Sequence, residues 1–316
     1  MLTDNKIVSS LRQAYGETLV QLGAENKNIV VLDADLACST QTIQFKKAFP
    51  ERFFNMGVAE QDAIGTAAGL AYSGKTAFFS TFAVFASGRA WDQVRCSVAY
   101  PKFDVKIVAT HGGVTVGEDG ATHQALEDIS LMRSLPNMKV IIPADSVETK
   151  AVIRYIAENK GPYYVRLTRP AMPEIFDAKK YKFDMKAKVL VEGKDITIAT
   201  YGETVVEALK CAEMLKEKGI SAEIINVPVI KPLDEETILK SARKTGAVLT
   251  VENHSIIGGL GSAVCELLAE NQPLPVKRVG VRDVFGQSGE YTELMKKYGL
   301  VAEKFIEDAM QLIEKK

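Results

Sequence analysis

The chain has 316 residues, and at about 150 residues per domain this length predicts two domains, each able to bury its own core. Lys and Arg total 39 and Asp and Glu total 40, so the net charge of −1 excludes a basic nucleic-acid-binding surface. Hydrophobic residues make up 47% and charged residues 25%, which excludes a disordered chain.

The four cysteines lie far apart and form no CxxC pair, so the sequence predicts neither a zinc site nor a disulfide framework. Residues 1–6 contain no apolar segment, and no run of about 18 apolar residues occurs along the chain. We therefore expect a cytoplasmic protein that neither binds nucleic acid nor enters a membrane.

Through the first half of the chain, buried-strand patterns alternate with helical patterns, which predicts a parallel sheet covered by helices on both faces. The predicted strands are 29–34, 75–80, 105–110, 139–142 and 163–167. The predicted helices are about 6–23, 58–73, 82–98, 124–134 and 146–159. The second of these helices is rich in Ala and Gly, so it is either a core helix or a face that another backbone or a ligand approaches closely.

Periodicity fades in residues 171–188, which contain Pro and several Lys, and we interpret this segment as a linker. It separates a domain of residues 1–170 from a smaller α/β domain of residues 189–316. The second domain has predicted strands near 195–201, 222–227, 247–252 and 276–280, and predicted helices near 203–219, 235–244 and 258–270. The predicted fold class is α/β, a doubly wound parallel sheet domain followed by a smaller α/β domain.

Two glycine-rich segments resemble phosphate-binding loops only superficially. Residues 69–76 match the pattern GxxxxGK[ST], but a helix is predicted before them and a strand after them, the reverse of a phosphate loop. We interpret Gly74 as the end of a helix. Residues 258–263 fall short of GxGxxG, because Val264 takes the place of the third glycine, and we expect a turn between a strand and a helix.

The segment 111–123 is the most informative in the chain, because it holds two of the three histidines and follows a predicted strand directly. Loops at the carboxyl ends of parallel strands form the ligand site of open α/β sheets. Imidazole exchanges protons near neutral pH, so His111 and His123 are candidates for contact with a substrate, with a metal site as the alternative. His254, beside Glu252, is expected to be structural.

Glu60 opens the predicted helix 58–73, where the helix dipole favours a negative charge. The alternative is a buried carboxylate directed at the ring nitrogen of a ligand. Phe82 and Phe85 follow the next strand, either as core residues or as a wall against which a planar ring stacks.

Taken in order, these segments resemble the C-terminal portion of transketolase, a thiamine diphosphate enzyme, over essentially the whole chain. Each motif is modestly specific, whereas their order and spacing are highly so. The motifs are Asp33-Ala-Asp35-Leu-Ala-Cys-Ser39, Gly57-Val-Ala-Glu60-Gln61, Ser80-Thr-Phe82-Ala-Val-Phe85, Thr110-His111 and the segment from Gly117 to Gln124.

The resemblance implies a catalytic, cofactor-binding role for Glu60, which would hydrogen-bond the pyrimidine nitrogen of the cofactor. Phe82 and Phe85 would surround that pyrimidine, and Asp35 would lie near the cofactor. It also implies a pyrimidine-binding domain followed by a transketolase C-terminal-type domain.

The resemblance places the substrate, a sugar phosphate, against two further groups of residues. Those of the substrate channel, His111, Asp119 and His123, would bond sugar hydroxyls, and the two histidines would assist proton transfer. Those expected to grip the phosphate are Arg12, Ser39 and Arg169, a task suited to guanidinium groups.

Three positions depart from the family pattern. Gly88 stands where many transketolases have a further aromatic residue in the pocket, Gly112 where they have Asp, and Ala121 where they have Pro. We therefore expect that the fit of the donor sugar and the contacts with the cofactor can differ from those in well-known transketolases.

The chain lacks the GDG motif and downstream Asn with which thiamine diphosphate enzymes hold the diphosphate through Mg²⁺ or Ca²⁺. We therefore expect this chain to be one subunit of a split transketolase, with the metal held mainly by a separate N-terminal subunit. A homodimer of heterodimers is the expected assembly. The alternatives are a 1-deoxyxylulose-5-phosphate synthase-like enzyme, the beta subunit of a 2-oxo-acid dehydrogenase, and a non-catalytic assembly subunit.

Overall fold

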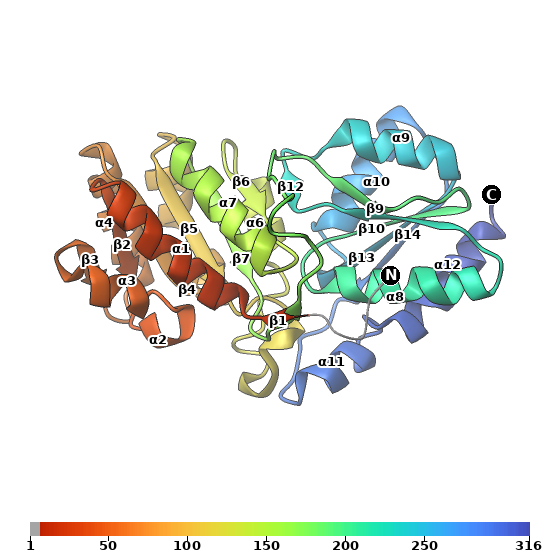
Figure 1. Ribbon diagram of the computed structural model, residues 1–316, viewed down its shortest axis with the longest axis horizontal. Coiled ribbons are helices and arrows are strands. Elements are labelled where there is room, and N and C mark those ends of the chain that lie inside the picture. The colour runs from red at the N-terminus through yellow and green to blue at the C-terminus, as the bar shows by residue number, and fades with distance from the viewer. Residues whose placement is uncertain (1–6) are drawn as a thin grey trace.

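A computed structural model describes residues 7–316, so the first residue of the predicted helix 6–23 and the first six of the predicted domain 1–170 lie outside the described part. Two large sheets lie side by side, each between layers of helices (Figure 1). The α/β class is thereby confirmed.

The first sheet has seven strands in the order β12-β6-β7-β5-β4-β2-β3 within residues 7–316. Pairing is parallel from β6 to β3, and only the edge strand β12 (Val229–Lys231) runs antiparallel to its neighbour. The other strands are β2 (Ile29–Asp33), β3 (Phe53–Asn55), β4 (Thr76–Phe82), β5 (Val105–Thr110), β6 (Lys139–Ile141) and β7 (Tyr163–Leu167).

Alternate residues of these strands face opposite layers of helices. Val31 and Phe78 pack in one buried cluster, while Leu32 and Phe79 pack in the other. The helices that contribute to the first cluster are α1 (Leu11–Glu25), α3 (Ile43–Ala48) and α7 (Ser146–Glu158). The second includes residues of α4 (Glu60–Tyr72) and α6 (Asp128–Ser134), together with helices of the second half of the chain. A sheet buried on both faces needs nearly continuous apolar strands, which is the pattern that the sequence shows.

The second sheet has the order β14-β13-β10-β11-β9 and is parallel except at the edge strand β9. Its strands are β9 (Lys188–Val191), β10 (Ile196–Thr200), β11 (Ala222–Asn226), β13 (Val248–Ser255) and β14 (Val276–Val281). Its helices are α8 (Thr204–Glu217), α9 (Glu235–Thr245), α10 (Leu260–Asn271), α11 (Tyr291–Lys297) and α12 (Ala302–Ile313), of which the last two lie beyond any predicted element.

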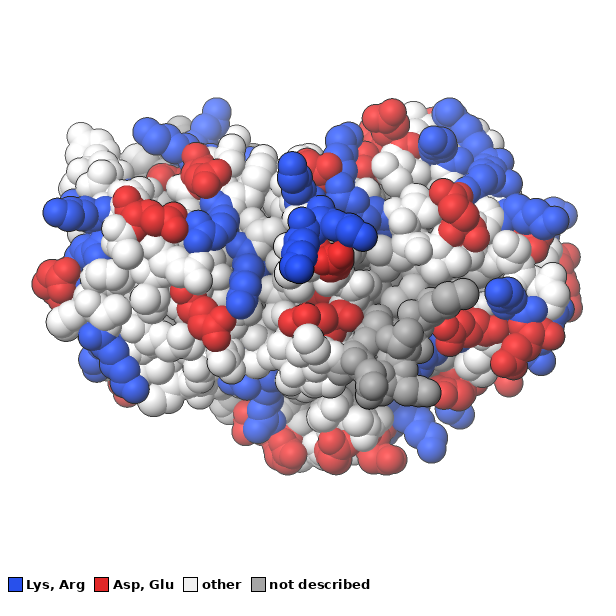
Figure 2. All heavy atoms as spheres, viewed as in Figure 1, with Lys and Arg blue, Asp and Glu red and all other residues white. Residues whose placement is uncertain are grey.

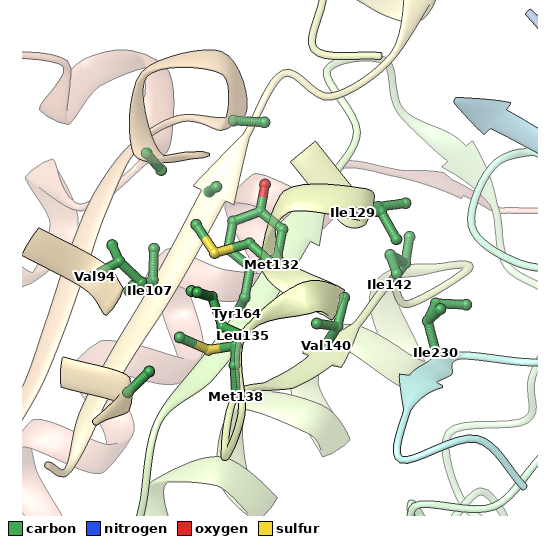
Figure 3. Packing of buried hydrophobic residues seen from close by; sticks show 14 of the residues in the cluster. Val94, Ile107, Ile129, Met132, Leu135, Met138, Val140, Ile142, Tyr164 and Ile230 are labelled. Carbon is green, nitrogen blue, oxygen red and sulfur yellow. The ribbon is translucent and has the colours of Figure 1, made fainter. Parts of the chain in front are cut away.

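One hydrophobic cluster is continuous between the two sheets. Figure 3 shows Ile230 of β12 beside Val140 and Ile142, and the same cluster includes Ile225 and Leu260 of the second domain. A strand from the second half of the chain therefore completes the sheet of the first half. Sequence periodicity does not predict that β12 joins this sheet.

The predicted helix 82–98 is wrong at its start and irregular beyond it. Thr81 and Phe82 pair with the end of β5, so β4 continues to Phe82. Two π-helical turns follow, η2 (Phe85–Arg89) and η3 (Val94–Ala99), separated by the short α5 (Trp91–Gln93). Strand pairing across the sheet outweighs the local helical pattern at this point.

The predicted helix 124–134 begins only at Asp128, and the predicted linker contains the short strand β8 (Met172–Pro173), which pairs with β1 (Val8–Ser9). Further short elements are α2 (Ala37–Thr40) and η1 (Pro50–Arg52). Charges of both signs are interspersed over the face shown in Figure 2. Among the helices within residues 7–316, none is both long and apolar enough to span a bilayer.

Candidate active site

The candidate residues gather where the central strands β4 and β5 end. Phe82 is the last residue of β4, and His111 follows Thr110, the last residue of β5. These two strands are parallel neighbours, so residues that follow them lie at the same edge of the sheet. Glu60 reaches this edge as the first residue of α4. The carboxyl edge of a parallel sheet is where ligands bind in this fold class.

Aromatic and imidazole rings form one connected cluster at this edge. The rings of Phe82 and Phe85 are stacked, with centroids 6.0 Å apart and planes 14° from parallel. The ring of His111 lies 3.9 Å from that of Phe82, and His123 contacts Phe85 edge-on at 5.4 Å. Four residues predicted from three separate segments are therefore in contact.

His111 is buried and has a strained backbone. Its φ of +60° lies in the left-handed region, which is uncommon outside glycine and occurs preferentially at functional sites. Its Nδ1 is 2.8 Å from the Thr110 hydroxyl, which leaves Nε2 as the nitrogen able to meet a ligand. Burial, followed by the positive charges of Arg12 and Arg169, lowers the pKa of His111 from 6.5 to about 3. This imidazole is neutral at physiological pH.

Glu60 is 1% exposed, and its carboxylate already has a partner. The Arg89 Nη1 donates to both carboxylate oxygens, at 2.9 and 2.8 Å, while the Arg89 guanidinium lies 4.7 Å from the centroid of the Phe85 ring. Glu60 and Phe85 thus hold a planar cation between them. The sequence did not point to Arg89.

The three residues predicted to grip a phosphate also come together, through backbone contacts. Arg12 donates to the carbonyl of Ser39 at 2.7 Å and to that of Arg169 at 3.0 Å. Arg169 bonds the Glu118 carboxylate at 2.7 Å and the carbonyl of Val116. Burial, followed by the charge of Arg169, lowers the pKa of Arg12, so the two guanidiniums together create a positive field. Such a field favours an anion.

Two predicted residues remain apart from these groups. Asp35, with a φ of +64°, accepts from the Asn55 side chain at 2.9 Å. Asp119 is exposed at the end of the short helix η4 (Val114–Asp119). No hydrogen bond within residues 7–316 joins either carboxylate to the ring cluster, so their predicted roles stay predictions.

The second domain holds the loop that carries the histidines. Asn253, fully buried in β13, accepts from the Val114 N–H at 2.9 Å and donates to the Thr115 hydroxyl at 3.2 Å. Gln124 donates to the carbonyl of Gln287 at 2.9 Å. The loop between the two histidines is therefore fixed from outside its own domain.

The packing around this loop also explains why Gly112 departs from the family pattern. A Cβ at this position would lie 2.2 Å from the Nε of Arg166, a buried guanidinium that bonds Asp128 and the carbonyl of Asn253. No side chain fits there. At Gly88, by contrast, a Cβ would meet nothing within 4 Å.

The remaining sequence motifs have structural roles. Gly74, with a φ of +89°, follows α4 and precedes β4, so residues 69–76 are not a phosphate loop, as expected. The N–H groups of Leu260 and Gly261, at the start of α10, bond the buried Glu252 carboxylate, which takes the place that a phosphate would need. His254 is fully buried beside Ser130 and Ser255, which agrees with a structural role.

Sequence reasoning missed Arg89 and Asn253. Arg89 is a lone cation in the otherwise uncharged stretch 77–91, and Asn253 stands between two singled-out residues, Glu252 and His254. These sequence positions only weakly indicated that the two residues have a role at the site. Their partners, Glu60 and Val114, are 29 and 139 residues away, so only the fold could show what they bind.

Family comparison agrees with the architecture. The family model described as "Transketolase, pyrimidine binding domain" matches residues 9–174, and that described as "Transketolase, C-terminal domain" matches residues 185–305. The chain belongs to the transketolase family. It corresponds to the C-terminal section of that thiamine diphosphate-dependent family, and the recognition made from its motifs is confirmed.

Several relatives match this transketolase section over nearly their whole length. A Methanocaldococcus jannaschii protein named as a transketolase C-terminal section is 55% identical, over 98% of each chain. The 6-deoxy-6-sulfo-D-fructose transketolase subunit SqwH of a Clostridium species is 45% identical, over 97% of this chain and 95% of its own. A 1-deoxy-D-xylulose-5-phosphate synthase from Caldanaerobacter subterraneus is 36% identical, but the match covers 49% of that enzyme.

Solved structures show the same section. One named as a split gene transketolase, an inactive beta4 tetramer, superimposes with a TM-score of 0.91 at 51% identity, over 98% of this chain and 99% of that one. A Pichia stipitis transketolase superimposes with a TM-score of 0.83 at 25% identity, and the match covers 47% of that chain.

The ring cluster fits the pyrimidine end of thiamine diphosphate, because Glu60 and Phe85 already hold a flat cation of comparable shape. Glu60, Phe82 and Phe85 would bind that ring. Within residues 7–316, no three His, Cys, Asp or Glu side chains are grouped as metal ligands.

Proposed function

We propose that this chain is the C-terminal subunit of a transketolase that moves a two-carbon ketol unit from a ketose phosphate to an aldose phosphate. The observation that carries the proposal is the contact of Phe82, Phe85, His111 and His123 beside the buried Glu60. A non-catalytic assembly subunit would have no need to bury the polar groups Glu60 and His111 in this cluster, because burying such groups is costly.

Thiamine diphosphate, when bound, supplies the carbon nucleophile for ketol transfer. The residues of this chain orient the reactants and handle protons. Glu60 accepts a hydrogen bond from the pyrimidine, and the two phenylalanines exclude water from it. His111 is neutral, so its Nε2 can accept a hydrogen bond from a sugar hydroxyl or donate one to it, depending on the tautomer. The ring of His123 lies edge-on to the rings of Phe82 and Phe85, with centroids 6.2 and 5.4 Å away.

Arg12 and Arg169 are proposed to hold the anionic end of the sugar, with Ser39 at the same site. Both guanidiniums lie near enough to His111 to lower its pKa, so an anion at the two arginines leaves the sugar chain directed toward the imidazole. Relatives are named for sulfo-fructose and for apulose 4-phosphate, which differ in their anionic group or sugar skeleton. Phosphate and sulfonate both suit this field.

The diphosphate and its Mg²⁺ or Ca²⁺ are proposed to be held by a separate N-terminal subunit that carries the GDG motif. One face of α4 supports a subunit boundary next to Glu60. Gly65 and Gly69 are exposed there with open space above them. Val58, two residues before the helix, and Tyr72, its last residue, are 73% and 80% exposed. A homodimer of heterodimers is the assembly that we propose.

The test is reconstitution with the N-terminal subunit, thiamine diphosphate and Mg²⁺. We expect ketol transfer from xylulose 5-phosphate to ribose 5-phosphate, with sulfo-fructose and apulose 4-phosphate as further donors. Glu60→Ala should lower kcat about 100-fold or more, because a group essential to proton transfer is lost. Glu51→Ala, a change at an exposed carboxylate in η1, is the matched control and should leave kcat unchanged.

The main competing activity is that of a 1-deoxyxylulose-5-phosphate synthase-like enzyme or a 2-oxo-acid dehydrogenase beta-type subunit, both of which use pyruvate or a similar 2-oxo acid. Turnover of pyruvate without ketol transfer would reject our assignment. Unchanged activity in Glu60→Ala would instead remove the cofactor role of Glu60.

A further inference from the structure

Arg89 occupies both binding partners that the proposed function assigns to the pyrimidine ring. Its Nη1 lies within 2.9 Å of both Glu60 oxygens, and its guanidinium lies over the Phe85 ring. A guanidinium is flat, positively charged and rich in donors. Those are also the properties of an aminopyrimidine that donates to a carboxylate while stacking on an aromatic ring. The two groups would compete for one place.

Burial of the two partners is strongly unequal. The Glu60 side chain is 1% exposed and the Arg89 side chain is 45% exposed. A buried carboxylate left without a partner is strongly unfavourable, so Glu60 needs a cation or a donor in every state of the protein. The half-exposed Arg89 can move into water at little desolvation cost. If the ion pair breaks, Arg89 can therefore move away into solvent, whereas Glu60 stays buried and takes another partner.

The turn that ends at Arg89 is irregular and adjoins open space. Arg89 ends the π-helical turn η2, in which the Ala90 N–H donates to the carbonyl of Phe85 at 3.3 Å. Isolated π-helical turns occur often at functional sites. A Cβ at the preceding Gly88 would meet no atom within 4 Å outside its chain neighbours, so open space lies at the position before the arginine. A larger residue at position 88 would fill that space.

We propose that Arg89 is a placeholder for the cofactor: it neutralises Glu60 in the cofactor-free chain, and thiamine diphosphate must displace it to bind. This inference rests on the proposed function. Two opposite effects follow from it. Arg89 stabilises the cofactor-free chain, and it weakens cofactor binding, because only the fraction of molecules with the pair broken is competent to bind.

The experiment compares the wild type with Arg89→Met, which keeps an apolar contact on Phe85 and removes the charge. In the reconstituted pair with Mg²⁺, titration of thiamine diphosphate by calorimetry should give a Kd about fivefold or more lower for the variant. In the cofactor-free chain, the same substitution should lower the melting temperature by about 5 °C or more. Arg95→Met, at an exposed arginine on η3, is the matched control and should change neither quantity.

A double variant shows whether the loss of stability comes from the Glu60–Arg89 ion pair or from a general disturbance of the fold. In the Glu60→Gln background the buried charge is absent, so Arg89→Met should no longer lower the melting temperature. A persistent loss would contradict the placeholder role. A Kd for Arg89→Met that is unchanged or higher would also overturn the inference, because Arg89 would then be neutral or part of the occupied site.

The inference and the proposed function fail in distinguishable ways. If the wild-type pair binds no thiamine diphosphate, both are rejected. If the wild-type pair binds it and Arg89→Met does not bind it more tightly, only the placeholder role is rejected. A structure of the loaded pair gives a direct check, in which the Arg89 guanidinium should be out of hydrogen-bond distance of both Glu60 oxygens.

Discussion

At the residue scale, His111 shows how environment sets the chemistry of a side chain. Sequence reasoning marked it because imidazole titrates near neutral pH, yet burial and two neighbouring arginines lower its pKa to about 3. The unfolded chain titrates near 6.5, so on acidification below that value the unfolded state takes up a proton that the folded state refuses.

We therefore predict an acid-dependent loss of stability that originates at His111. Between pH 6 and pH 4, its contribution to the free energy of unfolding should fall by ~1.4 kcal/mol per pH unit. His111→Asn should remove this component, because Asn does not titrate and tolerates a positive φ. Urea denaturation at pH 4, 5 and 6 measures the difference between wild type and variant. A difference that does not vary with pH would refute the prediction, and His123→Asn, at a partly exposed imidazole, is the control.

Residue identity predicted Glu60 and the histidines but not their partners. The carboxylate of Glu60 could be singled out because it begins a helix beside a recognisable motif. Arg89 carries no such mark, and its importance comes only from a contact across 29 positions. A buried charge requires a partner, but the sequence around it does not identify the residue that provides this partner.

At the scale of elements, the loop after β5 depends on the strand β13 of the second domain. Asn253 bonds the backbone of Val114 and the side chain of Thr115, and its own carbonyl accepts from Arg166 at 2.7 Å. The sequence offered no role for the second domain beyond packing in a dimer. Its contacts with the loop show that it also fixes the segment that follows His111.

We predict that Asn253→Ala makes this loop more mobile but leaves the affinity for thiamine diphosphate almost unchanged. In the reconstituted enzyme, kcat/KM for the sugar phosphates should fall about 10- to 100-fold, because a small displacement of reacting groups is costly. The Kd for thiamine diphosphate should stay within about twofold of the wild type, since Glu60, Phe82 and Phe85 lie on other elements. Asn271→Ala, at an amide that donates to the carbonyl of Leu267 in its own helix, is the control. Equal losses in both quantities would indicate general unfolding.

Elements were predicted well where the apolar pattern was continuous and poorly where long-range pairing decided. Strands β2, β4, β5 and β7 lie close to their predicted ranges because each is buried on both faces. The end of β4 was predicted as helix, since only its pairing with β5 keeps Phe82 extended. The strand β12 was not predicted at all, because its partner β6 is about 90 residues away.

At the scale of the whole molecule, Glu148 joins the two domains and the segment between them. It is fully buried at the start of α7, and its carboxylate accepts from the Ala144 N–H at 2.7 Å, from Asn226 at 3.0 Å and from the Tyr181 hydroxyl. Burial raises the pKa of Glu148 from 4.5 to about 7. Between these two pKa values, the folded protein therefore keeps a proton on Glu148 that the unfolded chain has released.

We predict that this junction weakens as the pH rises from about 5 to 7. Over that window the folded state binds more protons than the unfolded state, so the contribution of Glu148 to the free energy of unfolding should fall by ~1.4 kcal/mol per pH unit. Glu148→Gln should abolish this slope, which urea denaturation at pH 5, 6 and 7 would reveal. Glu158→Gln, at the other end of α7, is the control. A slope retained in Glu148→Gln would assign it to another group.

The sequence by itself determined the α/β alternation, the family and the positions of the residues at the strand ends, because those features depend on local composition and spacing. The tertiary structure decided that Arg89 meets Glu60, that Asn253 holds the loop after His111, and that a strand from the second half of the chain closes the first sheet. Each of these contacts joins segments 29 or more residues apart. Their geometry exists only after the chain has folded, so no local pattern encodes them.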